Sequence, residues 1–157
     1  GAINQLRTVT ATLDFSLLIA NLQAGRRQAA EEQVAVACQA LAAAGSDYLV
    51  VTSGTTSTLT SLARQRISAP FLDLAEACWK QAKPIAPVGL LCTRYAAAGG
   101  LFQRAAARHG IPLLLPAATT AEGVDRAIFD ELVLGQPSPA CILVLATAIK
   151  ELAASGA

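Results

Sequence analysis

The sequence predicts an α/β fold of two small lobes, with mostly parallel sheets flanked by helices and a cleft between the lobes. Short runs of β-branched residues or leucine alternate with longer stretches of helical period, which is typical of parallel sheets covered by helices. A proline-containing segment at residues 83–87 interrupts this alternation, which then restarts. A length of 157 residues suits two small lobes better than two large domains.

The first lobe is predicted over residues 1–84. Asp14 is placed to cap the first helix, and Gly45 to end the second, as glycine commonly does. The continuous apolar run at 47–52 is typical of a parallel strand that is covered on both faces. The expected strands cover 8–13, 47–52 and 70–72, and the expected helices cover 15–22, 26–44, a stretch ending near 66, and 74–82.

The second lobe is predicted over residues 85–157 and repeats the same alternation. Strands are expected over 88–92 and 111–115, and helices over 97–109, 121–134 and 140–154. In such folds the loops that follow the carboxyl ends of the strands carry the function. The loops after the strands at 47–52 and 88–92 are therefore the first places to look for a site.

The composition argues against several classes of protein. Lys and Arg total 12 against 11 Asp and Glu, so there is no basic stripe for a nucleic acid. Hydrophobic residues make up 54% and charged residues 15%, which excludes a disordered chain. No apolar run approaches the roughly 18–20 residues that span a bilayer, and the start lacks the apolar core of a signal peptide. A cytoplasmic protein with no membrane and no nucleic-acid partner is expected.

The cysteines Cys38, Cys78, Cys92 and Cys141 are far apart in the sequence and form no CxxC pair. With His109 as the single histidine, zinc fingers and multi-histidine metal sites are excluded. We therefore predict free thiols, no metal, and mostly packing roles for the sulfur atoms.

The loop at residues 52–58 is rich in hydroxyl groups. Ser53, Gly54, Thr55 and Thr56 offer hydroxyls, a permissive glycine and backbone N–H groups at a helix N-terminus, which together suit a small carboxylate or phosphate. The alternative is an ordinary helix cap supplied by Thr56, Ser57 or Thr58. No GxSxG elbow surrounds Ser53, and His109 is the only imidazole that could act as its base, so a serine hydrolase is not expected.

The second loop begins with Cys92, Thr93, Arg94 and Tyr95. A hydroxyl beside a guanidinium at a strand end suits carboxylate binding, because the guanidinium presents paired donors. The alternative is a surface arginine beside a partly buried tyrosine.

Several blocks, in this order and spacing, resemble the aspartate/glutamate racemase family of cofactor-independent enzymes. They are TLDF at 12–15, AAGSDYLV at 43–50, VGLLCTRY at 88–95, GIPLLLP at 110–116, IFDEL at 128–132 and LGQPSP at 134–139. The resemblance implies the two-lobed α/β fold, an isomerase that needs no pyridoxal phosphate or other cofactor, and an amino acid or small carboxylate held in the cleft between the lobes.

The resemblance also implies that one thiol per lobe moves the α-proton, since a thiol can be tuned to ionise near neutral pH. The position of the first thiol holds Ser53, followed by Gly54 where the family has asparagine. The strand bearing the second thiol is expected beyond residue 157, and the family's first strand before residue 1. Cys92 is a candidate replacement. Gly54, Thr55, Thr56, Thr93 and Arg94 are the expected substrate-binding residues.

These features predict a racemase-family protein that binds a small carboxylate or amino acid but whose racemase chemistry is impaired. One alternative is a non-catalytic pseudo-enzyme or assembly partner, since strands missing at the ends would leave open sheet edges that find a partner, most simply in a homodimer. A further alternative is a decarboxylase or isomerase of the same superfamily, in which the hydroxyl-rich loop holds an oxyanion.

Overall fold

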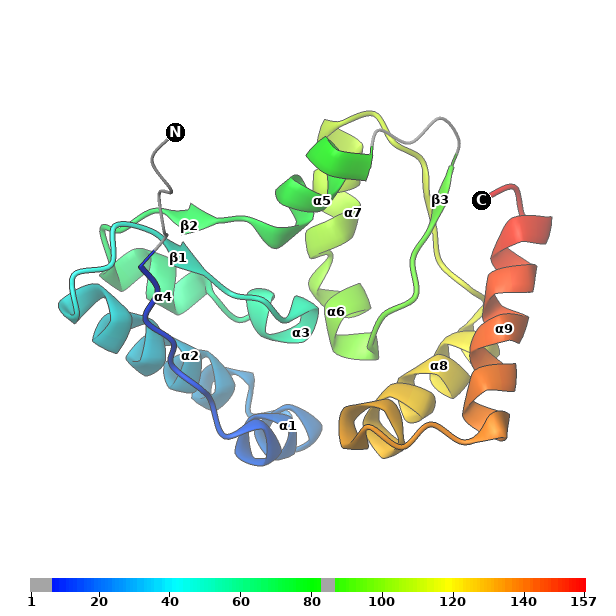
Figure 1. Ribbon diagram of the computed structural model, residues 1–157, viewed down its shortest axis with the longest axis horizontal. Helices are drawn as coiled ribbons and strands as arrows, with labels where there is room; N and C mark the ends of the chain where they lie inside the picture. Colours follow the sequence, from blue (N-terminus) through cyan, green and yellow to red (C-terminus); the bar gives the residue numbers. More distant parts are fainter. Residues whose placement is uncertain (1–6, 83–86) are drawn as a thin grey trace. The chain divides into compact units, whose positions relative to one another are not determined.

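The computed structural model describes residues 7–82 and 87–157 (Figure 1). It is a helix-rich α/β protein with short parallel strands, which confirms the predicted fold class. The chain divides into two compact units, one made of Gly1–Thr52 and Leu59–Asp73 and the other of Ser53–Thr58 and Leu74–Ala157. The predicted linker at 83–87 and the lobe boundary at 84 and 85 fall almost entirely outside the described residues, and the two predicted lobes stay a prediction.

The first unit packs helices against one pair of strands. Strand β1 runs parallel to β2, with Leu49 opposite Phe71 and Val50 opposite Leu72. Helix α2 packs against α1 and α4, and Leu18 and Val34 are fully buried in the core. The elements of this unit are α1 (Phe15–Gln23), α2 (Arg27–Ala43), β1 (Leu49–Val50), α4 (Ser61–Arg66) and β2 (Phe71–Leu72).

Two helix-end predictions in this unit are confirmed. Asp14 caps α1, because its Oδ1 accepts a hydrogen bond of 3.0 Å from the backbone N–H of Leu17. Gly45 follows α2 with φ +85°, a conformation that side chains other than glycine rarely adopt. Arg66 donates two hydrogen bonds, of 2.6 and 2.9 Å, to the carboxylate of Glu32 and so ties α4 to α2.

The second unit is built around the parallel pair β3 and β4, with Val88 opposite Leu113 and Gly89 opposite Leu114. Helix α9 packs on β3 so closely that a Cβ on Gly89 would lie 2.8 Å from Leu152 Cδ1. Its elements are α3 (Gly54–Ser57), α5 (Leu74–Ala82), β3 (Val88–Gly89), α6 (Arg94–Gly99), α7 (Leu101–Arg108), β4 (Leu113–Leu114), α8 (Ala118–Asp130), the 3₁₀ helix η1 (Leu132–Leu134) and α9 (Pro139–Ala154).

Some predicted elements were wrong in extent. Residues 8–13 form no strand, since they pair with no strand in the part of the chain that the structure describes. The runs at 88–92 and 111–115 contribute only short strands, because β3 and β4 pair over two residues each. The helix predicted over 97–109 is two helices, α6 and α7, separated by Gly100, whose φ of +64° no continuous α-helix allows.

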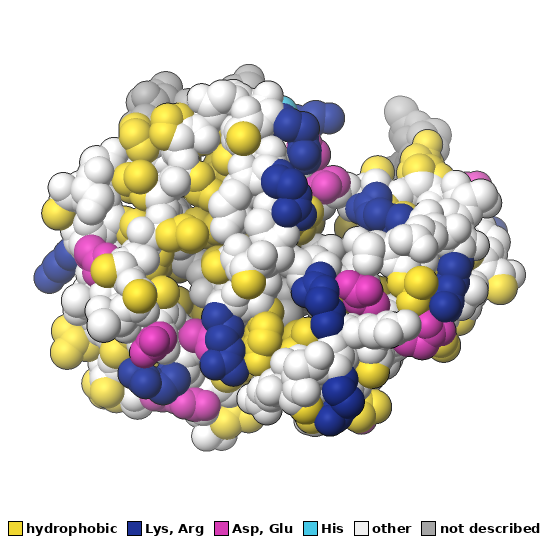
Figure 2. All heavy atoms as spheres, turned by 180° about the vertical axis from the view of Figure 1, so that it is seen from behind, with side chains coloured by type: hydrophobic (Ala, Val, Ile, Leu, Met, Phe, Trp, Pro, Cys, Tyr) yellow, Lys and Arg dark blue, Asp and Glu magenta, His cyan; other side chains and the backbone are white. Residues whose placement is uncertain are grey.

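Ion pairs at the surface link neighbouring helices within each unit. On α5, Glu76 pairs with Arg108 and shares a hydrogen bond of 2.7 Å with His109 Nε2, and these contacts lower the pKa of the Glu76 carboxyl. On the face drawn in Figure 2, acidic side chains lie beside basic ones at several points, as short-range ion pairs require. Within the described residues, no helix has the length and apolar character needed to cross a membrane.

Candidate functional site

The two loops that the sequence singles out meet inside the second unit. The hydroxyl oxygens of Thr55 and Thr93 lie 2.7 Å apart in a hydrogen bond, although the two residues are 38 positions apart in the chain. Both threonines are buried, at 6% and 8% exposure. The bond therefore fixes the loop after β1 against the loop after β3.

In the first loop the hydroxyls serve mainly to build α3. Ser53 Oγ accepts a hydrogen bond of 3.3 Å from the backbone N–H of Thr56, so Ser53 is the cap, and the prediction of a cap at Thr56, Ser57 or Thr58 was wrong. The cap lies earlier than predicted because the helix begins at Gly54, with only three residues between it and the end of β1 at Val50. A Cβ on Gly54 would lie 3.3 Å from the ring of Phe102, so a larger residue here would require a slight shift of that ring.

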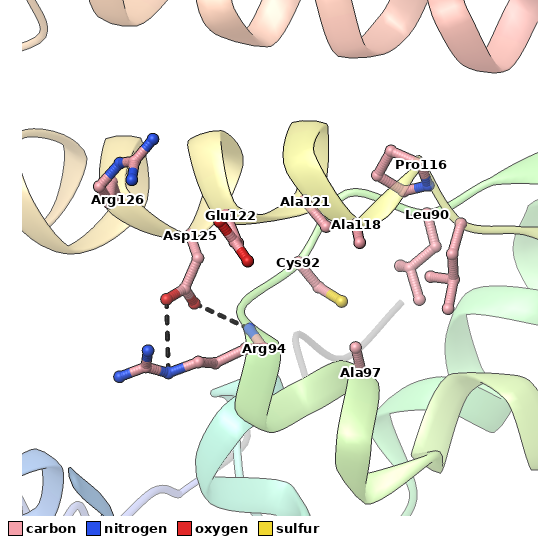
Figure 3. A pocket seen from close by; sticks show the side chains of 11 residues that line it. Leu90, Cys92, Arg94, Ala97, Pro116, Ala118, Ala121, Glu122, Asp125 and Arg126 are labelled. Carbon is pink, nitrogen blue, oxygen red and sulfur yellow. Dashed lines mark hydrogen bonds and ion pairs between the residues drawn. The ribbon is translucent and has the colours of Figure 1, made fainter.

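In the second loop Thr93 caps α6, with its Oγ1 accepting a hydrogen bond of 3.1 Å from Ala96 N. The next residue, Arg94, is anchored to Asp125 of α8 (Figure 3). Its backbone N–H donates a hydrogen bond of 2.8 Å to Asp125 Oδ1, and its Nε lies 3.6 Å from Oδ2. The guanidinium also donates to the hydroxyl of Tyr95, at 3.0 Å. Arg94 is exposed and Tyr95 half-buried, but the arginine is held in place at both ends.

A pocket of about 580 Å³ opens beside this arginine, within the second unit. Figure 3 shows α8 along one side of it, with Cys92 and Ala97 on the opposite side. Its apolar lining consists of Leu90, Ala97, Leu115, Pro116, Ala118 and Ala121. Its polar lining consists of Cys92, Arg94, Glu122, Asp125 and Arg126. Among the described residues, this lining combines two guanidiniums, two carboxylates and a thiol around a largely apolar interior.

The surroundings of Cys92 favour its thiol form over the thiolate. Burial raises its pKa above the ordinary value, and the negative charge of Asp125 raises it further. A protonated thiol is a poor base, so Cys92 does not by itself supply a group that takes a proton near neutral pH.

The structure brings only some of the predicted site residues to this pocket. Cys92 and Arg94 line it, whereas Thr93 lies between them and supports the loop through its cap and its bond to Thr55. Ser53, Gly54, Thr55 and Thr56 do not line it. Their predicted roles in catalysis and substrate binding stay predictions. His109, the only imidazole available to Ser53, makes its contact with Glu76.

Sequence reasoning missed the charged residues that α8 contributes, Glu122, Asp125 and Arg126. A signal for Asp125 was present, because it falls on the apolar stripe of its helix, between Val124 and Ile128. A carboxylate at such a position must find a partner once it is buried, and Arg94 is that partner. No group of three or more metal-ligating side chains occurs in the described ranges.

The fold is that of an α/β protein whose second unit contains a pocket with charged and apolar lining residues. Comparison with known proteins identifies the class, since the family model of Asp/Glu/hydantoin racemases matches residues 5–157. This chain belongs to that family. It is also similar to the crystal structure of a provisionally assigned Asp/Glu racemase from Yersinia pestis, with 28% identity and a TM-score of 0.77. That alignment covers 99% of this chain and 69% of the Yersinia chain.

Proposed function

We propose that this protein binds a small carboxylate or amino acid in the pocket beside Arg94 and does not racemise it by the two-thiol route. The observation that carries the proposal is the guanidinium of Arg94, oriented by Asp125 at a pocket with an apolar interior. A guanidinium in a fixed orientation favours carboxylates, because its paired donors match the two oxygens. The predicted cleft between the two lobes stays a prediction, and this proposal rests on the pocket alone.

The remaining charges in the pocket suit a zwitterion. Glu122 and Arg126 are exposed residues of α8, and within the described part of the chain neither makes an ion pair. They are four positions apart on a helix, so they lie on neighbouring turns of the same face. A carboxylate and a guanidinium placed in this way provide a partner for an ammonium group and a second partner for a carboxylate.

The groups available to move the α-proton are the reason to expect impaired racemisation. Racemisation without a cofactor removes the α-proton from one face and returns a proton to the other, which takes a competent acid or base on each face. Ser53, at the position that the resemblance gives to the first thiol, is occupied as a helix cap. To remove an α-proton, the hydroxyl of Ser53 would first have to give its own proton to a neighbouring base. His109, the only imidazole, is instead in contact with Glu76.

The test combines binding with exchange at the α-carbon. Calorimetric titration with aspartate and glutamate is expected to show saturable binding, and Arg94→Gln is expected to weaken it by roughly tenfold, since a charged hydrogen bond is lost. The control is Arg27→Gln, which removes an exposed i,i+4 pair with Glu31 in the first unit and should leave affinity unchanged. In D₂O near neutral pH, neither amino acid should gain deuterium at the α-carbon above background.

Failure of this proposal has two distinct forms. Absence of binding to the wild-type protein, or equal binding by wild-type protein and Arg94→Gln, would contradict the site. Rapid α-deuteration of aspartate or glutamate would contradict the impaired chemistry and show that a working pair of proton-transfer groups exists.

A second candidate function, assembly with another copy of this chain, is favoured by the surface of α9. Ile142, Leu143 and Ile149 are 54%, 66% and 57% exposed, which is unusual for large apolar side chains on one helix. We propose a homodimer that buries this surface. Sedimentation should then report a dimer for the wild-type protein and a monomer for Leu143→Glu, while a wild-type monomer at every concentration would contradict the proposal.

A further inference from the structure

Among the charged side chains of the pocket, Asp125 stands apart by its burial. The residue is 7% exposed, whereas Arg94, Glu122 and Arg126 are exposed residues. Its carboxylate also has two links to Arg94, one to the backbone N–H at 2.8 Å and one to Nε at 3.6 Å. A buried charge is screened far less by water and salt than an exposed one. The charge of Asp125 therefore interacts more strongly with a bound ligand than an exposed unit charge would.

The four charges that line the pocket cancel in the described structure. Arg94 and Arg126 are cationic, and Glu122 and Asp125 are anionic, so the lining has no net charge. Such a lining stabilises separated positive and negative groups on a ligand but gives no net attraction to a dianion. Removing the charge of Asp125 would leave the pocket with a net positive charge and the guanidinium of Arg94 without its carboxylate partner.

We propose that Asp125 is the specificity-determining residue of this pocket: its buried carboxylate positions and offsets Arg94, so that amino acids are preferred to dianions of the same size. The inference rests on the proposed function and deepens it. Aspartate and succinate are the natural pair of probes, because they share a four-carbon dicarboxylate skeleton and differ by the ammonium group. In the wild-type protein aspartate should bind more tightly than succinate.

The same charge acts on the neighbouring thiol. The charged groups that line the pocket with Cys92 are Arg94 from α6 and Glu122, Asp125 and Arg126 from α8, while the residues after β4 contribute none. In Figure 3 the side chains of Arg94 and Arg126 point away from the Cys92 sulfur. The raised pKa of the Cys92 thiol has the charge of Asp125 as its second cause, after burial. Neutralising Asp125 should therefore move the pH profile of Cys92 alkylation to lower pH, a change that a purely structural role would not produce.

The experiment compares Asp125→Asn with Glu122→Gln by calorimetry and by mass-spectrometric alkylation rates at the Cys92 peptide. Both variants remove one negative charge from the lining, and the amide oxygen introduced by Asp125→Asn can still accept the hydrogen bond from Arg94 N. In Asp125→Asn, affinity for succinate relative to aspartate should rise about fivefold, as expected for loss of a poorly screened unit charge. In Glu122→Gln the same ratio should change less than about twofold.

An unchanged succinate-to-aspartate ratio in Asp125→Asn, or an equal change in Glu122→Gln, would overturn the inference while leaving the proposed function in place. A wild-type protein that binds neither probe would overturn the proposed function, and the inference with it. If Asp125→Asn does not fold, Arg94→Gln tests the same inference, because removing the positive charge should change both measurements in the opposite direction. That variant should lose more affinity for succinate than for aspartate and shift Cys92 alkylation to higher pH, and the reverse order would overturn the inference.

Discussion

Replacing Gly99 by alanine is expected to destabilise the protein by about 2–3 kcal/mol, at the upper end of what overpacking costs. A Cβ at this position would clash with Thr58 Cγ2 and lie 2.5 Å from Thr58 Cβ. Thr58 cannot move away freely, because its hydroxyl donates a hydrogen bond of 2.7 Å to the carbonyl of Thr55. Since α3 packs on α6 through this contact, the variant should also disturb the loops around Thr93.

The matched control is Gly123→Ala, in the interior of α8. There the nearest atom to an added Cβ is Val144 Cγ1 at 3.4 Å, an ordinary contact. Alanine favours a helix over glycine by about 0.8–1.0 kcal/mol, so this variant should be slightly more stable than the wild-type protein. Urea unfolding of both variants provides the comparison. Equal stability of Gly99→Ala and the wild-type protein would contradict the close packing of α3 on α6.

Thr93→Val should lower the free energy of unfolding by about 2–3 kcal/mol, although it preserves the shape of the side chain. The hydroxyl of Thr93 both accepts from Ala96 N, as the cap of α6, and bonds to Thr55 Oγ1. Its removal leaves a buried hydroxyl and a helix-end N–H without their partner, and each loss has its own cost.

Two further variants sharpen this prediction. Thr147→Val removes an exposed hydroxyl that bonds to Leu143 O in its own helix, and should change stability by less than about 0.5 kcal/mol. In the double variant Thr55→Val with Thr93→Val the buried pair is removed together, so the loss should be smaller than the sum of the single losses. Strict additivity in urea unfolding would show that the two hydroxyls do not interact.

Local signals were sufficient to predict most helices of this fold. Asp14 and Gly45 mark helix ends that the structure confirms, because capping and left-handed glycine conformations are properties of a few adjacent residues. The strands were predicted too long, since a strand ends where its partner ends and the partner lies far away in the sequence. The break at Gly100 was also missed, although the pair of glycines at 99 and 100 is a local signal for it.

The candidate site was predicted in part, because only its local features are visible in the sequence and contacts between distant residues are not. Cys92 and Arg94 lie in the loop after a strand, and the ends of strands can be recognised from the sequence. Asp125 comes from a helix 31 positions later, and only the folded chain shows that its carboxylate meets Arg94. The composition of the hydroxyl-rich loop at Ser53 predicted a binding site. In the structure, Ser53 caps a helix and Gly54 packs against Phe102.

The most direct test of the account is the position of the ligand, followed by NMR on ¹⁵N-labelled protein during titration with aspartate. The side-chain Nε–H signal of Arg94 and the backbone signal of Ala97 are expected to shift in a saturable manner. Signals of α2 residues in the first unit, such as Val36, should remain unchanged. Saturable shifts confined to α2, or no shift at Arg94 at saturating ligand, would contradict a carboxylate site in this pocket.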